Sequence, residues 1–208
     1  MRKINRGNPD PAFLKFASQK PVPSWKNLPS GLRQNITLQL LSEQDGLSGY
    51  TEKPIQENVH IDHFRKQDLF PKNILDWYNF VVDEHGKDYG ADHKDKNVKM
   101  GDYVKIIDPI QEDPHNFFDY MANGEIIPKK GLSTADEEKA KFTIDIFNLN
   151  HESLVDLRMT IMQMVEDCKK GKMLPHDISD CLRLRFPKCN RILDSCMPLI
   201  LLYRIVYC

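Results

Sequence analysis

The sequence predicts an α+β fold, in which a small strand-and-helix unit is embedded in a mainly α-helical body. Three segments support this class: residues 47–62 are typical of two short strands or a hairpin, Asn123-Gly124 joins two short apolar runs, and residues 134–170 repeat apolar side chains at helical spacing. The chain has 208 residues, 40% hydrophobic and 28% charged, so it can bury one substantial core.

The predicted organisation is one compact domain with three parts. They are an N-terminal arm and helix (1–45), the strand-and-helix unit (46–103), and a β-hairpin followed by helices (104–208). In the first part, five prolines between positions 7 and 30 indicate an extended arm with a short helical turn near Ala12–Phe16. Ser30 can cap a following helix over 31–45, because its hydroxyl can accept from the N–H groups of a first turn.

The middle part contains short elements. Residues 47–62 supply the predicted strands, and a helix or turn follows from Pro71 to Asn79. Residues 86–103 are rich in Gly, Asp, Lys and His, which predicts a loop with a short helix carrying His93.

The last part combines one hairpin with helices. Asn-Gly favours the positive-φ turn of a hairpin, and Ser133 and Asn150 are typical N-cap residues. The predicted elements are strands over Phe117–Met121 and Glu125–Pro128, and helices over 134–147, 151–170, 176–185 and 190–207.

The composition restricts the classes of function. The net charge of −1 gives no overall nucleic-acid signature, although residues 1–34 hold seven Lys/Arg against one acidic residue and could line a substrate channel or dock on an acidic partner. All five cysteines lie in the last forty-one residues without Cys-x-x-Cys spacing, which is typical of reduced thiols in a cytosolic protein. The apolar run 197–207 is far shorter than the roughly 20 residues of a membrane span, so no membrane association is expected.

The most informative segment reads His-Ile-Asp-His at 60–63 and is followed closely by an Arg-Lys pair. In a strand, alternation places His60 and Asp62 on one face and His63 on the other, whereas at a frayed strand end the adjacent Asp and His side chains can converge on one bound phosphate. A carboxylate can hold a divalent cation, a neutral imidazole can take a proton from water, and Arg and Lys suit a phosphate. Metal-assisted phosphodiester hydrolysis needs this combination. Structural hydrogen bonds or an adventitious metal site are the alternative interpretation.

The order Asp-His, then Asn, then His-Lys resembles the HNH nuclease motif, in which a ββα unit binds one metal ion. The resemblance implies that Asp62 and His93 are ligands of one Mg²⁺ or Mn²⁺ ion and that His63 is the general base. Asn79 would brace the loop that carries the base, and His60 would orient His63 or complete the metal shell. The cations expected to contact nucleic-acid phosphates are Arg65, Lys66 and Lys94.

The similarity extends beyond this motif to segments 49–55, 113–120 and 143–151. Together these segments resemble the PtuB-type HNH endonucleases of the Septu and retron anti-phage defence systems. The resemblance implies a toxic effector endonuclease that cuts DNA or tRNA in the cytoplasm. It also implies a partner ATPase of the PtuA type and, in retrons, a reverse transcriptase with its RNA–DNA product.

The sequence departs from this family at one point. Many relatives hold a structural zinc ion with Cys-x-x-Cys pairs near Tyr50 and His93, whereas this chain has no cysteine before Cys168. No structural zinc is therefore expected, and packing and hydrogen bonds must hold the loop. The departure leaves a catalytically degenerate scaffold that only binds the ATPase as an open alternative. It also leaves rival metal ligands, which are His85, Asp88, Asp92 and Asp95.

Overall fold

The computed structural model describes residues 1–55 and 58–170. Helices and two small antiparallel sheets confirm the α+β class. The predicted helices over 176–185 and 190–207, the apolar run 197–207 and four of the five cysteines lie outside the described residues. Within the described part, no helix combines the length and the apolar character needed to span a membrane.

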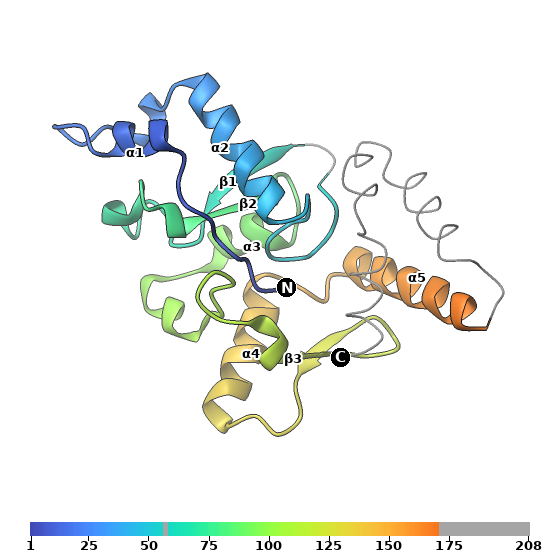
Figure 1. Cartoon of the computed structure of the whole chain (residues 1–208). Helices are drawn as coiled ribbons and strands as arrows, with labels where there is room; N and C mark the ends of the chain where they lie inside the picture. The colour runs from blue at the N-terminus through green and yellow to red at the C-terminus, as the bar shows by residue number, and fades with distance from the viewer. Residues whose placement is uncertain (56–57, 171–208) are drawn as a thin grey trace.

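The helices and strands are short and are linked by single turns of 3-10 helix. The α-helices are α1 (Pro11–Ala17), α2 (Ser30–Glu43), α3 (Gly90–Asn97), α4 (Thr134–Ile146) and α5 (Glu152–Lys169). The strands are β1 (Val59–His63), β2 (Phe80–Glu84), β3 (Phe118–Tyr120) and β4 (Ile126–Pro128). The 3-10 segments are η1 (Trp25–Asn27), η2 (Pro71–Asn73), η3 (Trp77–Asn79), η4 (Met100–Lys105) and η5 (Pro114–Asn116). Figure 1 shows α1 and α2 at one end, α4 and β3 at the other, and β1, β2 and α3 between them.

The N-terminal arm forms the expected short helix, but its second helix begins differently from the prediction. Asp10 caps α1, because its carboxylate accepts from Ala12 N at 2.7 Å and from Phe13 N at 3.2 Å. The predicted cap at Ser30 is wrong. Helix α2 begins at Ser30 itself, and Pro29 takes the cap position without a side-chain bond.

The first sheet pairs β1 with β2, which corrects the predicted hairpin within 47–62. In that segment only an isolated bridge joins Leu47 to Pro54. Strand β1 instead pairs antiparallel with β2, so that His60 lies opposite Asp83 and His63 lies opposite Phe80. The partner strand is favoured because its run of Phe and two Val residues is fully buried.

This sheet lies between two hydrophobic clusters. One face of β2, with Phe80 and Val82, packs against residues of α1 and α2. The other face, with Val81, packs in a larger cluster with residues of α3 and α4. Because side chains alternate along a strand, His60 and Asp62 face the α3 side, and His63 faces the α2 side.

Helix α3 follows β2 after one loop and packs against β2 and α4. The elements β1, β2 and α3 therefore form a strand–strand–helix unit in chain order. Gly90 begins α3 at φ +66°, and a Cβ there would meet the carboxylate of Asp83. This contact explains why the close approach of α3 to β2 requires glycine.

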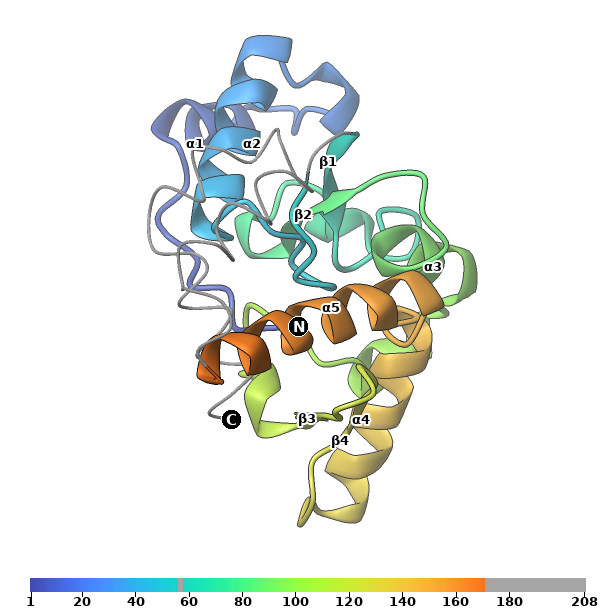
Figure 2. The same cartoon turned by 90° about the vertical axis from the view of Figure 1, so that its right-hand side faces the viewer.

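The second half confirms the predicted hairpin and one of the two predicted caps. Strands β3 and β4 pair across a turn in which Gly124 has φ +81°. Ser133 Oγ accepts from Asp136 N at 3.1 Å and caps α4. The predicted cap at Asn150 is wrong, because its side-chain amide instead bonds Ile126 N at 2.8 Å and Ile126 O at 2.9 Å. Figure 2 shows α5 running across this hairpin below the strand–strand–helix unit.

Candidate metal centre

The general base expected from the sequence, His63, lies in the core on the α2 side of the sheet. Its Nε2–H donates to Ile74 O at 2.9 Å, and its Nδ1 accepts from Gln67 Nε2 at 3.1 Å. The rings of Trp25 and Phe80 meet it edge-on at centroid distances of 4.8 and 5.1 Å. Burial lowers the pKa of His63, so the imidazole is neutral with both nitrogens engaged.

The expected metal ligand Asp62 lies on the opposite face and is buried, and one of its carboxylate oxygens has two partners inside the fold. The Tyr50 hydroxyl donates to its carboxylate, and Lys94 Nζ donates to the same oxygen at 2.6 Å. The Lys94 side chain is 0% exposed. Burial opposes the charge of Lys94, but Asp62 and Asp95 outweigh burial and raise its pKa. Lys94, expected to contact phosphate, therefore serves as the internal counterion of Asp62.

Asn79 binds backbone groups of the loop that follows β1. Its Oδ1 accepts from Arg65 N at 2.7 Å, and its Nδ2 donates to Arg65 O at 3.1 Å and to Asn73 O at 3.0 Å. Among the expected phosphate ligands, Arg65 lies 4.0 Å from Asp108, and Lys66 Nζ donates to Asp95 O at 2.9 Å. Both cations are thus partly committed to neighbouring groups.

The second expected ligand, His93, lies on α3. Its Nδ1–H donates to Ile146 O at 2.9 Å, which ties α3 to the end of α4. In the described part of the chain, three metal-ligating side chains converge at one place, and neither Asp62 nor His93 belongs to that group.

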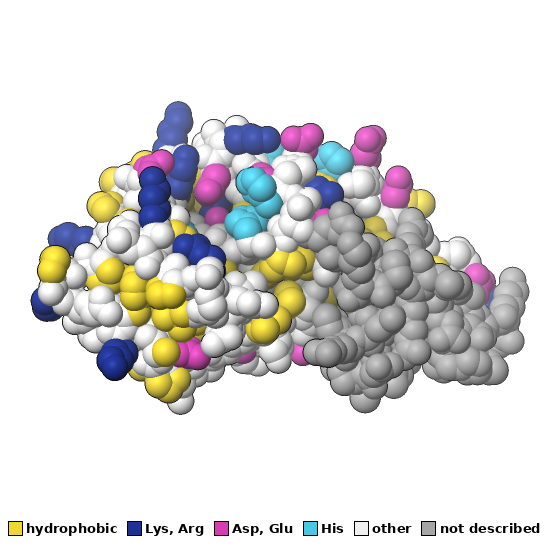
Figure 3. Space-filling model, turned by 90° about the horizontal axis from the view of Figure 1, so that it is seen from above, with side chains coloured by type: hydrophobic (Ala, Val, Ile, Leu, Met, Phe, Trp, Pro, Cys, Tyr) yellow, Lys and Arg dark blue, Asp and Glu magenta, His cyan; other side chains and the backbone are white. Residues whose placement is uncertain are grey.

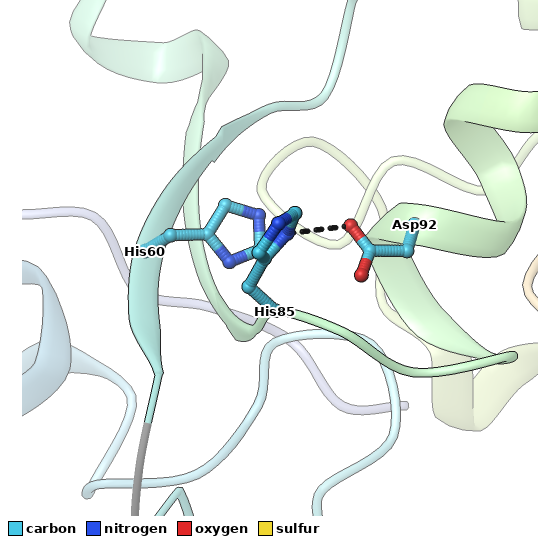
Figure 4. Close-up of side chains that lie close together, drawn as sticks. All are labelled: His60, His85 and Asp92. Carbon is cyan, nitrogen blue, oxygen red and sulfur yellow. Dashed lines mark hydrogen bonds and ion pairs between the residues drawn. The ribbon is translucent and has the colours of Figure 1, made fainter.

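That group consists of His60, His85 and Asp92, whose ligand atoms all lie within 4.8 Å of one another. Figure 4 shows the three side chains meeting from β1, from the loop after β2, and from α3. His85 Nδ1–H donates to Asp92 Oδ1 at 2.9 Å, and the rings of His60 and His85 lie 5.1 Å apart. An ion bound by both groups would replace the proton that His85 shares with Asp92.

Two features indicate that this cluster can accept a ligand. His60 Nδ1 is buried and has no hydrogen-bond partner among the described residues. The side chain of His85 is 69% exposed, so the cluster opens to solvent. Figure 3 shows histidine side chains gathered on this face of the molecule, with Lys/Arg and Asp/Glu side chains beside them.

Asp92 is held in place by the loop that carries His85. Its carboxylate accepts from the backbone N–H groups of Gly86 and Lys87, the second at 3.1 Å. Burial opposes the charge, but these bonds and His85 lower the pKa of Asp92. The carboxylate is therefore ionised and fixed, as a metal ligand must be.

Hydrogen bonds fix residues 48–51 in the loop before β1. Ser48 Oγ accepts from Tyr50 N at 3.2 Å and from Thr51 N at 3.0 Å. Asp83 accepts from Ser48 and from Ala91 N, the latter at 2.7 Å, and burial raises the pKa of Asp83 to about 6. These bonds join the loop before β1 to β2 and α3.

Sequence reasoning included His85 and Asp92 only as rival ligands. The signal that connects them with His60 is the pairing of β1 with β2, because the register Val59↔Glu84 brings His60 beside the residue that follows β2. Strand β2 was not predicted from the sequence. No protein-family model matches the chain, and no curated protein matches it at a significant level.

Proposed function

We propose that this chain is a metal-dependent endonuclease of the HNH class that hydrolyses phosphodiester bonds in DNA or tRNA. The proposal places the ion at His60, His85 and Asp92. The observation that carries it is the convergence of these three ligands on one open face of a strand–strand–helix unit. Three protein ligands leave positions for water and a phosphate oxygen, which is the arrangement of catalytic rather than structural metal sites.

The three ligand types restrict which metal ion is expected at this site. Two imidazoles and one carboxylate suit Mn²⁺ or another first-row transition ion better than Mg²⁺, which prefers oxygen ligands. A bound ion would lower the pKa of its water and neutralise charge on the phosphate. The chain itself contributes the ligands and, at Lys87, a cation on the loop that binds Asp92.

The proposal does not use His63 as the base in the resting structure, because both of its nitrogens are occupied. An ion held by His60, His85 and Asp92 would supply the activation of water, so the proposal needs no base at His63. The proposal gives Asn79 a positioning part, supported by the hydrogen bonds of its amide to the backbone between β1 and η2.

We also propose that the chain works as a toxic effector with a partner ATPase of the PtuA type, and in retrons with a reverse transcriptase and its RNA–DNA product. The support is the similarity of segments 49–55, 113–120 and 143–151 to PtuB-type proteins.

A second candidate function is a scaffold that binds the ATPase without cutting nucleic acid. The specific observation in its favour is that Asp62 is neutralised by Lys94 and His63 is buried. These are the two positions that the HNH motif assigns to ligand and base.

Nuclease assays on plasmid DNA and total tRNA separate the two candidates. The chain is incubated with Mn²⁺ or Mg²⁺, alone and with its ATPase partner, next to His85→Ala and the control His151→Ala, which changes a histidine outside the metal-ligating group. The endonuclease proposal predicts cutting that requires a divalent ion, is lost in His85→Ala and persists in the control. Saturable Mn²⁺ binding without cutting under any of these conditions supports the scaffold. Cutting that is equal in His85→Ala and the unmodified chain contradicts the proposed site.

A further inference from the structure

The ammonium group of Lys94 lies in a buried ring of oxygen atoms. Its Nζ donates to Asp62 Oδ2 at 2.6 Å, to His63 O at 3.0 Å and to Phe64 O at 3.2 Å, which uses all three of its protons. Asp95 Oδ1 lies at 3.2 Å as a further charge. The oxygens come from the end of β1 and from α3, and they meet at one point.

This ring has the composition of a site for a hard cation. Ca²⁺ binds carboxylate and backbone carbonyl oxygens at 2.3–2.6 Å, and the ring offers two of each kind. Two carboxylates surround the single ammonium group, and the nearby Lys66 Nζ donates to Asp95 O outside the ring. The Asp95 side chain is 38% exposed, but its Oδ1 atom is buried, and apart from the ion pair with Lys94 it has no hydrogen-bond partner among the described residues.

We propose that Lys94 is a tethered cation that fills an oxygen-lined cation site at the junction of β1 and α3, and that this site binds Ca²⁺ when the ammonium group is removed. The inference does not depend on the proposed nuclease activity. It rests on the four oxygens around Nζ and on the complete burial of the lysine.

The charge balance explains why an ion would enter. Without Lys94, the buried carboxylate of Asp62 would face the partly exposed carboxylate of Asp95 with no cation between them, and a buried carboxylate without its partner is costly. A divalent ion of suitable size would restore the balance and rejoin the end of β1 to α3. In the unmodified chain, Lys94 holds the end of β1 and α3 together without a metal ion. It also occupies the place from which an ion in solution could bind Asp62. Metal ions that exchange with solution would then bind at the proposed cluster of His60, His85 and Asp92.

The experiment uses full-length chains that carry His85→Ala, which removes the other metal site. Lys94→Ala is added, and Ca²⁺ and its luminescent analogue Tb³⁺ are the probes. Tyr50 lies beside the ring, with its hydroxyl donating to Asp62, so it can sensitise Tb³⁺ emission. The proposal predicts Tyr-sensitised emission that saturates in the Lys94→Ala chain, is displaced by Ca²⁺ and is absent from the chain that retains Lys94.

Thermal unfolding supplies the second measurement. With a chelator present, Lys94→Ala should lower the midpoint temperature of unfolding. Ca²⁺ at about a hundredfold excess over its Kd should raise that temperature by about 5–10 °C. The chain that retains Lys94 should not respond. Adding Asp62→Asn to Lys94→Ala should abolish both the emission and the rise in midpoint.

Three results would overturn the proposal. The first is a folded Lys94→Ala chain that binds neither ion. The second is binding that survives Asp62→Asn, because the ion would then lie elsewhere. The third is a Lys94→Ala chain that stays unfolded at millimolar Ca²⁺, because a cation site at this junction should restore the fold.

Discussion

Asp62 and His63 are neighbours in the sequence, but their side chains point to opposite faces of the β1–β2 sheet. Asp62 bonds Lys94 on the α3 side, and His63 bonds Ile74 on the α2 side. One phosphate or ion cannot contact both groups while β1 keeps this pairing. The Asp-His pair is therefore engaged inside the resting fold, and the proposed ligands come instead from β1, from the loop after β2 and from α3.

The buried His63 should make stability depend on pH. Its pKa is lowered in the folded chain, so the unfolded chain binds a proton that the folded chain does not. Its contribution to the free energy of unfolding is complete above about pH 6.5, the ordinary histidine pKa, and is lost as the pH falls below it. The loss has a limiting slope of about 1.4 kcal/mol per pH unit.

Urea unfolding between pH 7.5 and 5.5 measures this effect. His63→Gln keeps one donor and one acceptor but cannot titrate, so its free energy of unfolding should fall less steeply than that of the unmodified chain. Equal slopes for His63→Gln and the unmodified chain would show that His63 binds its proton equally well in both states.

Asn79 should be a main support of the loop between β1 and η2. Replacing it with alanine removes three partly buried hydrogen bonds and leaves backbone groups of Arg65 and Asn73 without these partners. We expect Asn79→Ala to lower the free energy of unfolding by about 2–4 kcal/mol in urea titrations. The control Asn97→Ala, whose exposed amide makes one bond to His93 O, should cost less than about 1 kcal/mol. A small effect of Asn79→Ala would mean that other contacts fix the loop.

The Asp62–Lys94 pair should show strong coupling in a double-mutant cycle. Either Asp62→Asn or Lys94→Met alone leaves one buried charge without its partner, and we expect each to cost about 3–5 kcal/mol of unfolding free energy. The double substitution should cost clearly less than the sum of the two. Additive costs from chemical denaturation would indicate that the two charges act independently.

The sequence predicted those features that depend on neighbouring residues. The alternation of β1, the Asn-Gly hairpin and the Ser133 cap each follow from a few adjacent positions, and all three are confirmed. The predicted cap at Asn150 is wrong because its side-chain amide bonds the backbone of Ile126, which is distant in the sequence. Local propensity carries no information on such tertiary competition.

The candidate site was harder to predict, for a physical reason. His60, His85 and Asp92 converge only through the pairing of β1 with β2 and the packing of α3. Likewise, nothing in the motif indicates that Lys94 points inward, where Asp62 and two carbonyl groups make burial of an ammonium group tolerable. Both outcomes depend on long-range contacts rather than on the order of residues in the motif.

Calorimetric titration with Mn²⁺ tests the location of the exchangeable metal site most directly. We predict saturable binding to the unmodified chain, and a loss of at least about tenfold in affinity for His85→Ala and for Asp92→Asn. Asp62→Asn, once circular dichroism shows it to be folded, should bind Mn²⁺ as the unmodified chain does. Loss of binding in Asp62→Asn, with unchanged binding in His85→Ala, would contradict the proposed site and return the ion to the HNH position at Asp62.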